Sequence, residues 1–575
     1  MADLLAELTA EMTAPGQRYE TIEEVIGGRT YRVWKNAPTS LAEVWRQAET
    51  HGGADYLVYE DERISYAQVV KQVASLRSGL SARGVVKGDR VALATRNYPE
   101  WVASFWAIVT LGAVVVPLNA WWASAELAYG LADSGAKAAI VDQDRMERLL
   151  PELMAGAPPN LAHLFGVRCE ESSVAATRGR LARQGIDAVP LATLLEEDSP
   201  GPIDVELLPE DMATIFYTSG TTGRPKGALG THRNICTTLM SLFFLAARSQ
   251  RAYGTKQETS TQNAVLVSVP LFHATGCHGL LVPNTMAGGK LVMMRRWNPE
   301  RALELIERER INNFIGVPTM VWQALNSPAL ARRDTSSLRT VSCGGAPAPP
   351  ELLRRLRARF PATIPSNSYG LTETSSVATS IAGEEYAQRP ESVGRPLPVV
   401  EVRVVGAEGE VAGAYETGEL WIHGANVVPG YWNRPAATAA AIQEGWFRTG
   451  DLAYLDDEGF VYIVDRAKDV LIRGGENVYS AEVEAAIYGN PCVADAAVIG
   501  IPDLEMGEEV AAVVRLHAGC DASEDTIRAA VAAKLAAFKV PKYIFFHPEP
   551  LPRNAAGKLL KRQLREEMVS RLVQE

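Results

Sequence analysis

A loop rich in glycine and hydroxyl side chains runs from Tyr217 to Gly227, with the sequence YTSGTTGRPKG. Its glycines let backbone N–H groups turn toward an anion, its serine and threonines offer hydroxyl donors, and Lys226 adds a positive charge. The loop is not a Walker P-loop, because Lys226 is followed by Gly227 in place of a serine or threonine. We therefore predict a different kind of polyphosphate site, formed by Thr218, Ser219, Gly220, Thr221, Thr222, Gly223 and Lys226.

Two more residues have side chains suited to catalysis. His273 follows the apolar run VLVSVPLF, and Lys558 lies in the sequence PRNAAGK near the C-terminus. Taken alone, such a histidine is a core residue satisfied by a backbone carbonyl, and such a lysine is a solvated surface residue. A metal site is disfavoured, because His278 lies five residues after His273, the wrong spacing for a helical i, i+4 pair.

The composition and charge indicate which classes of protein the chain can belong to. The 575 residues are 47% hydrophobic and 22% charged, which predicts a soluble globular protein of two or more domains. A net charge of −11 without a long Lys/Arg block gives no support for nucleic-acid binding. The six scattered cysteines and the acidic N-terminus, which lacks a secretory signal pattern, favour a cytoplasmic location. Residues 101–118 are uncharged, but Gly112 and Pro117 interrupt them, so we predict a buried helix and strand and no integral membrane segment.

The elements that must position these residues form an α/β pattern. Strand and helix patterns alternate over about 55–145 and 211–370, whereas 385–465 has short β runs separated by Gly/Asp turns. A compact series of helices and strands follows Asp465. We predict an N-terminal domain over residues 1–465, made of two α/β layers and a small β-rich subdomain at about 385–465. A small mobile α+β lid over residues 466–575 would follow it, with a hinge at 465–469.

Seven further motifs follow the phosphate loop in order. They are PLFHATG (270–276), GGAP (344–347), YGLTET (369–374), GELW (418–421), GWFRTGD (445–451), DRAKD (465–469) and LPRNAAGK (551–558). With the loop, they resemble the adenylate-forming superfamily, which includes acyl-CoA synthetases, luciferases and nonribosomal adenylation domains. The resemblance covers roughly residues 40–565.

The resemblance implies a role for each motif. Thr372 would contact a phosphate, Glu373 a magnesium ion, Asp451 the ribose hydroxyls and Arg466 the ribose or phosphate. Lys558 would bridge the substrate carboxylate and the α-phosphate, so that Lys558, His273, Thr372 and Glu373 form the catalytic set. The remaining residues that resemble the ATP/AMP site are Gly344, Gly345, Ala346, Pro347, Asn367, Ser368, Tyr369, Gly370 and Ile463.

The resemblance also implies two half-reactions with a lid that turns between them. Lys468 would be the pivot, and Gly474, Gly475 and Glu476 would line the tunnel for coenzyme A. His273 would lie beside the substrate carboxylate. The acyl pocket would be formed by His273, Thr275, Cys277, Gly279, Val317 and Gly344.

The residues next to two of these motifs indicate the branch of the superfamily. Phe272 is followed by His273 and not by the aspartate that holds an α-amino group, and no carrier domain follows Lys558. We therefore expect an ATP-, Mg²⁺- and coenzyme A-dependent ligase for a medium- or long-chain fatty acid or a bulky ring-bearing acid. An acyl-AMP ligase that loads a carrier protein, a luciferase-like oxygenase and a nucleotide-binding sensor remain as alternatives. Homodimers are common in the family, so a homodimer is one expected state.

Overall fold

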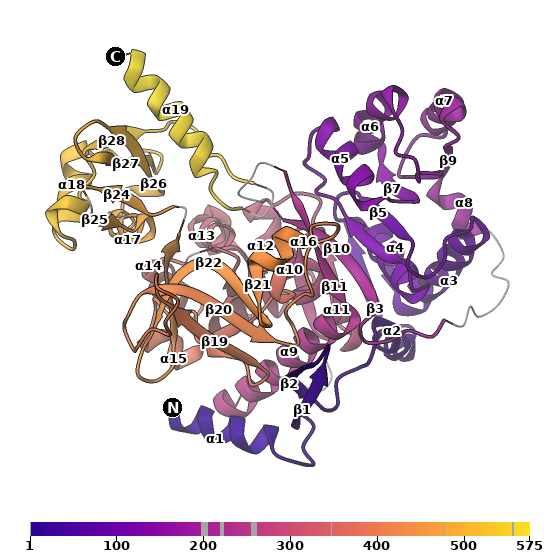
Figure 1. Ribbon diagram of the computed structural model, residues 1–575, viewed down its shortest axis with the longest axis horizontal. Helices are drawn as coiled ribbons and strands as arrows, with labels where there is room; N and C mark the ends of the chain where they lie inside the picture. Colours follow the sequence, from indigo (N-terminus) through magenta and orange to yellow (C-terminus); the bar gives the residue numbers. More distant parts are fainter. Residues whose placement is uncertain are drawn as a thin grey trace.

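The computed structural model describes residues 2–196, 205–218, 224–254, 262–346, 348–467, 469–474, 476–554 and 557–574. Within this part of the chain, two large sheets form the body of the molecule (Figure 1). The first has the spatial order β11 (Lys226–Thr231), β10 (Met212–Thr218), β6 (Val114–Pro117), β5 (Arg90–Ala94), β7 (Ala138–Asp142), β8 (His163–Val167) and β9 (Asp187–Pro190). The second has the order β18 (Arg395–Pro396), β17 (Thr379–Ala382), β16 (Ile364–Tyr369), β15 (Thr340–Gly344), β14 (Asn313–Gly316), β12 (Ala264–Val267), β13 (Lys290–Met293), β3 (Asp55–Tyr59) and β4 (Glu62–Ser65).

Most neighbouring strands in both sheets run parallel, as the alternating pattern predicted. The two sheets differ at two places from the two ranges, 55–145 and 211–370, in which the pattern alternates. The β3–β4 hairpin joins the second sheet through β13, and β10 joins the first sheet beside β6. Local patterns report which residues form strands, whereas pairing is decided by tertiary packing over long separations in the sequence.

Helices fill the space between the sheets and cover their outer faces. A single hydrophobic cluster joins both sheets through α2 (Leu41–Ala48), α3 (Tyr66–Ala82), α4 (Pro99–Thr110), α8 (Leu191–Glu196), α9 (His232–Tyr253) and α11 (Val282–Met286). The outer helices are α5 (Ser124–Ser134), α6 (Gln143–Ala155) and α7 (Glu171–Leu181) on the first sheet, and α12 (Pro299–Arg308), α13 (Pro318–Asn326) and α14 (Pro350–Arg359) on the second.

The uncharged segment 101–118 is a buried helix and strand, as predicted. In α4 every residue but Glu100 is buried, and β6 is buried along its whole length. A helix that is apolar all round belongs in the interior of a protein. Among the described helices, none is both long enough and apolar enough to cross a lipid bilayer.

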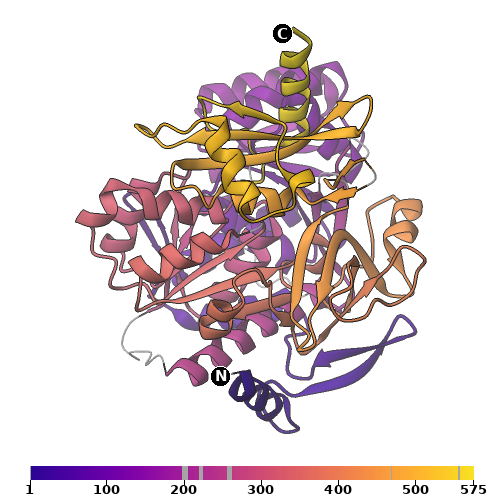
Figure 2. The same cartoon turned by 90° about the vertical axis from the view of Figure 1, so that its left-hand side faces the viewer.

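A β-rich subdomain and a C-terminal domain follow the two sheets. The subdomain contains β19 (Val400–Val405), β20 (Gly418–Gly424), β21 (Ile442–Gln443), β22 (Trp446–Leu455) and β23 (Val461–Arg466). The C-terminal domain contains β24 (Leu471–Arg473), β25 (Glu476–Val478), β26 (Val493–Asp503), β27 (Gly507–Leu516), β28 (Tyr543–Phe546), α17 (Ser480–Ile487), α18 (Glu524–Ala532) and α19 (Lys561–Gln574). Figure 2 shows it, in gold and yellow, lying over the α/β layers with the orange subdomain beside it.

Three elements differ from the sequence-based expectations. The helical pattern expected from Glu524 to Phe538 ends at Ala532, because Leu535 and Phe538 pack back against the core of the domain. The sequence pattern also missed α19, which has little amphipathic character. It missed the N-terminal helix α1 (Ala2–Thr13) and the hairpin of β1 (Thr21–Ile26) and β2 (Arg29–Trp34), which pack near α9 and β20.

The first residue of α9 couples the stability of this fold to pH. His232 is 1% exposed, and the backbone N–H of Leu41 donates to its Nδ1 over 3.1 Å. Burial lowers the pKa of His232 to about 4 from the ordinary 6.5. Its neutral form therefore stabilises the fold above pH 6.5, and this contribution is lost as pH falls toward 4. The linkage relation gives a loss of up to about 3 kcal/mol.

We expect the melting temperature to fall between pH 6.5 and 4, and to fall less in His232→Asn. Asparagine can accept the same hydrogen bond without titrating. Differential scanning calorimetry across this pH range checks the prediction. Equal slopes for the two proteins would contradict it.

Candidate active site

The end of β10, the turn after β16 and the segment after β20 meet at the predicted phosphate site. Glu373 lies in the short helix Thr372–Thr374 and is 8% exposed. Its Oε1 accepts a hydrogen bond from the hydroxyl of Tyr431 (2.8 Å) and lies 3.5 Å from Oγ1 of Thr218. Lys226 begins β11 opposite Thr218, and its Nζ lies 5.4 Å from the centre of the Tyr431 ring. The structure thus brings a carboxylate, a hydroxyl and an ammonium group together.

Tyr431 is a site residue that sequence reasoning missed. It follows Pro429-Gly430 in a stretch without charged neighbours, and only the Pro-Gly turn could have marked it. Burial and the Glu373 carboxylate raise the pKa of Tyr431, so its hydroxyl stays protonated and donates to Glu373.

Gly370 fixes the turn that carries Thr372 and Glu373. A Cβ placed on it would lie 2.0 Å from the carbonyl oxygen of Ser376, which is backbone and cannot move aside alone. We expect Gly370→Ala to displace the turn and slow ATP-dependent adenylate formation by about 100-fold, since a 1 Å misplacement can cost that much.

Gly179→Ala is the matched control, because Gly179 lies in α7 with nothing within 4 Å of its added Cβ. Pyrophosphate release measured for both variants checks the prediction. Two variants with equal activity would show that the turn tolerates the displacement.

The predicted ribose site lies on the β22–β23 hairpin. Asp451 and Arg466 face each other in register, and Arg466 Nε donates to Asp451 Oδ1 over 2.9 Å. The hydroxyl of Tyr369 donates to Asp451 Oδ2 over 2.6 Å. Asp451 is 3% exposed, so its carboxylate is held in place by two donors. Ile463 lies on the same hairpin.

The predicted adenine slot is formed by two neighbouring parallel strands. Gly344 ends β15 and pairs with Ser368 of β16, beside Asn367. Gly345 follows with a φ of +79°, and its added Cβ would lie 3.8 Å from Val317 Cγ1. The strand ends and Tyr369 therefore form one edge of the sheet, next to the Asp451 hairpin.

His273 ends the loop after β12, directly before the short helix Ala274–Gly276. Its Nε2 is buried and has no hydrogen-bond partner among the described residues. Burial lowers the pKa of His273 to about 4, and the nearby Lys558 ammonium group lowers it as well. The imidazole is thus neutral near pH 7, and its electrostatic neighbour is the predicted catalytic lysine.

Lys558 lies on a turn that contacts both the C-terminal and the N-terminal domain. Arg553 donates to both carboxylate oxygens of Asp495 (2.7 and 2.8 Å) and to the carbonyl of Gly557 (2.7 Å). The added Cβ of Gly557 would lie 2.8 Å from Cγ2 of Val317, so the turn contacts the N-terminal domain beside the adenine strand. This pose of the C-terminal domain places Lys558 near His273.

Further contacts hold the pose at the predicted hinge, residues 465–469. The backbone N–H and hydroxyl of Ser480 donate to Asp465 Oδ2 (2.5 and 2.8 Å), and Lys561 Nζ contacts Ser480 Oγ and Glu484 Oε1 (2.5 and 2.8 Å). Ser480 is 0% exposed. These contacts link the end of β23 to the starts of α17 and α19.

For the remaining predicted site residues, either the role stays a prediction or the residue lies outside the described part of the chain. Gly474 and Glu476 are exposed in this pose, and their place in a tunnel stays a prediction. Cys277 is 0% exposed within the cluster between the two sheets, so its place in the acyl pocket also stays a prediction, as do those of Thr275 and Gly279. The predicted residues outside the described part of the chain are Ser219, Gly220, Thr221, Thr222, Gly223, Pro347, Lys468 and Gly475.

Comparisons with known proteins agree with this geometry. The sequence profile of "AMP-binding enzyme" matches residues 44–432, and that of "AMP-binding enzyme C-terminal domain" matches residues 482–558. A feruloyl-CoA synthase of Amycolatopsis sp is 36% identical over 519 residues, covering 90% of this chain and 95% of the relative. A long-chain-fatty-acid–CoA ligase of Bacillus subtilis (strain 168) is 31% identical over 523 residues, covering 88% and 90%.

Among solved structures, o-succinylbenzoate CoA synthetase from Bacillus subtilis, in complex with its acyl-adenylate intermediate, superposes with a TM-score of 0.74. It is 30% identical and covers 92% of this chain and 98% of its own. The phosphate site and Lys558 lie within the two matched regions, whereas Asp451 and Arg466 of the predicted ribose site lie between them. The chain therefore belongs to the AMP-binding family of adenylate-forming enzymes, in its acyl-CoA synthetase branch.

Proposed function

We propose that this protein joins a carboxylic acid to coenzyme A in two steps. In the first, a carboxylate oxygen attacks the α-phosphorus of ATP, which forms the acyl-adenylate and releases pyrophosphate. In the second, the thiol of coenzyme A attacks the acyl carbon, which forms the thioester and releases AMP. The observation that carries the proposal is that Lys558 lies close enough to His273 to act on it electrostatically, in a chain that also brings Glu373 and Lys226 together around Tyr431.

Residues of both domains have a role in the first step. The Lys558 ammonium group is placed to stabilise the charge that builds between the carboxylate and the α-phosphate, and neutral His273 offers a donor to the carboxylate. Asp451 can accept from the ribose hydroxyls, because its carboxylate has lone pairs beyond those used by Tyr369 and Arg466. Lys226 and Thr218 can donate to the departing phosphates.

Glu373 fits a magnesium ion that arrives with ATP. Mg²⁺ is usually bound by one or two carboxylates together with substrate phosphates. Within the described part of the chain, no three His, Cys, Asp or Glu side chains are grouped to hold a metal by themselves. A single buried carboxylate suits this shared coordination, and the ion would neutralise charge on the phosphates.

For the acid, we propose a medium- or long-chain fatty acid or a bulky ring-bearing acid. Relatives of both kinds support this range, since one is named for feruloyl-CoA and another for long-chain fatty acids. Thr275, Gly279 and Gly344 in the predicted pocket wall are small residues, which is what either kind of acid would require.

The test is pyrophosphate release with ATP and Mg²⁺ across a panel of fatty and aromatic acids, with and without coenzyme A, and thioester detected by mass spectrometry. Thioester product supports the proposal and ranks the acids. Pyrophosphate and acyl-adenylate without thioester would indicate a carrier protein as the acceptor. ATP binding without pyrophosphate release would indicate a nucleotide-binding protein without ligase activity.

A further inference from the structure

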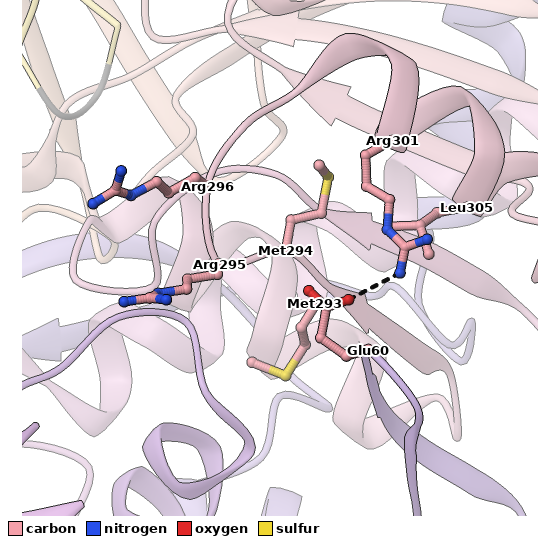
Figure 3. Close-up of a pocket in the computed structure, with 7 residues that line it drawn as sticks. All are labelled: Glu60, Met293, Met294, Arg295, Arg296, Arg301 and Leu305. Carbon is pink, nitrogen blue, oxygen red and sulfur yellow. Dashed lines mark hydrogen bonds and ion pairs between the residues drawn. The ribbon is translucent and has the colours of Figure 1, made fainter. Parts of the chain in front are cut away.

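A surface cavity of about 330 Å³ lies where the chain leaves β13 (Figure 3). It is lined by Glu60, Met293, Met294, Arg295, Arg296, Arg301 and Leu305. Arg301 pairs with Glu60 at 3.0 Å on one side of the cavity. Arg295 and Arg296 extend together toward the other side, and neither makes an ion pair with any described residue.

A third arginine adds to this charge. Arg96 follows β5 and is half-buried, and burial together with the nearby Arg145 and Arg296 lowers its pKa to about 10. The acidic groups near it, Asp142 and Asp144, both pair with Arg145 at 2.8 Å. Arg96, Arg295 and Arg296 therefore make no ion pair with a described carboxylate, although Asp142 and Asp144 lie near Arg96.

These arginines adjoin the loop that carries His273. The side chain of Asn97 donates to the carbonyl of Val269 (3.2 Å) and accepts from the backbone N–H of Leu271 (3.0 Å). Phe272, the residue before His273, packs against Ala120. The Arg96 segment is thus fastened to the loop two residues before the catalytic histidine.

An exposed aromatic ring lies at the same place. Trp121 follows Ala120 and is 50% exposed, and the Arg96 guanidinium lies 5.4 Å from the centre of its ring. Guanidinium groups bind phosphate oxygens through charge-assisted hydrogen bonds, and an exposed indole can stack with a purine base. The cluster therefore has the chemistry of a site for a phosphorylated adenine nucleotide.

We propose that Arg96, Arg295 and Arg296, with Trp121, bind the nucleotide end of coenzyme A, the phosphates on the arginines and the adenine on the indole. This assignment rests on the proposed function, because it requires coenzyme A as the thiol donor. In the proposed first step the phosphates of ATP are bound by Lys226, Thr218 and a magnesium ion on Glu373, so these arginines are available to a second nucleotide.

The test compares coenzyme A with pantetheine, which carries the same thiol arm without phosphates or adenine. We expect Arg295→Ala/Arg296→Ala to lower kcat/KM for coenzyme A by about tenfold or more, since hydrogen bonds to charged groups are the strong ones. The value for pantetheine stays unchanged. Trp121→Ala should act in the same direction, with the loss again confined to coenzyme A.

Arg183→Ala is the matched control, because Arg183 is exposed and has no ion pair among the described residues, but lies after α7 on the outer face of the first sheet. Parallel losses for both thiols, or no loss for either, would overturn the nucleotide site while leaving the ligase activity in place. A wild-type enzyme that forms acyl-adenylate but no thioester with either thiol would overturn the proposed acceptor, and this assignment with it.

Discussion

Lys558→Ala should reduce acyl-adenylate formation by about 1,000-fold and leave thioester formation from supplied acyl-adenylate within a few-fold of wild type. Removing one group that stabilises developing charge costs 10² to 10³ in rate, and a full ammonium charge belongs at the upper end. In the second step the lid is predicted to have turned and carried Lys558 away from the site, so its ammonium group is not needed there. Single-turnover pyrophosphate release measures the first step, and thioester formation from synthetic acyl-adenylate measures the second.

Lys534→Ala is the control, because Lys534 is an exposed lysine of the same domain that lies after α18. It should leave both steps unchanged. Equal losses in the two half-reactions for Lys558→Ala would show that the lysine acts on folding or on domain closure rather than on adenylate chemistry.

Asp451→Asn should raise the KM for ATP by about 100-fold. The substitution keeps the size of the side chain but removes the charge that pairs with Arg466, and it places an amide donor opposite one of the two donors, Arg466 or Tyr369. A loss of about 3 kcal/mol follows from charge-assisted hydrogen bonds broken at a buried position. Titration of ATP in the pyrophosphate-release assay measures it directly.

The matched control is Asp457→Asn, in the exposed turn of the same hairpin. Its KM for ATP should equal that of wild type. A change of less than threefold in Asp451→Asn would show that the ribose binds elsewhere.

The sequence predicted the elements better than their arrangement. The buried helix and strand at 101–118 followed from the absence of charge and the interruptions at Gly112 and Pro117, and the turn between β22 and β23 followed from Asp-Glu-Gly. The N-terminal helix and hairpin were missed, although Leu5, Leu8 and Met12 have helical spacing and Gly27-Gly28 is typical of a hairpin turn. The strand β11 was missed because its sequence, KGALGT, has two glycines and no alternation.

In the candidate site, several chemical groups could be predicted from motifs, but not all of their hydrogen-bond partners. Lys226, Glu373, Asp451 and Lys558 were predicted from motifs, but Tyr431, which donates to Glu373, was not. The unpaired arginines after β13 were also missed, because a local sequence does not show which charges lack partners. Motifs identify groups that do chemistry, whereas hydrogen-bond partners depend on segments brought together only by folding.

Strand β3 lies early in the sequence but belongs to the second sheet, and this has a consequence for synthesis of the chain. Residues 57–59 of β3 pair with residues 291–293 of β13, so the second sheet cannot close at this edge until more than half of the chain has left the ribosome. Until then the apolar β3 strand has an open edge, and pairing over such separations is slow to form. An N-terminal fragment that ends before β13 would therefore expose this edge and aggregate, whereas the longer chain covers it.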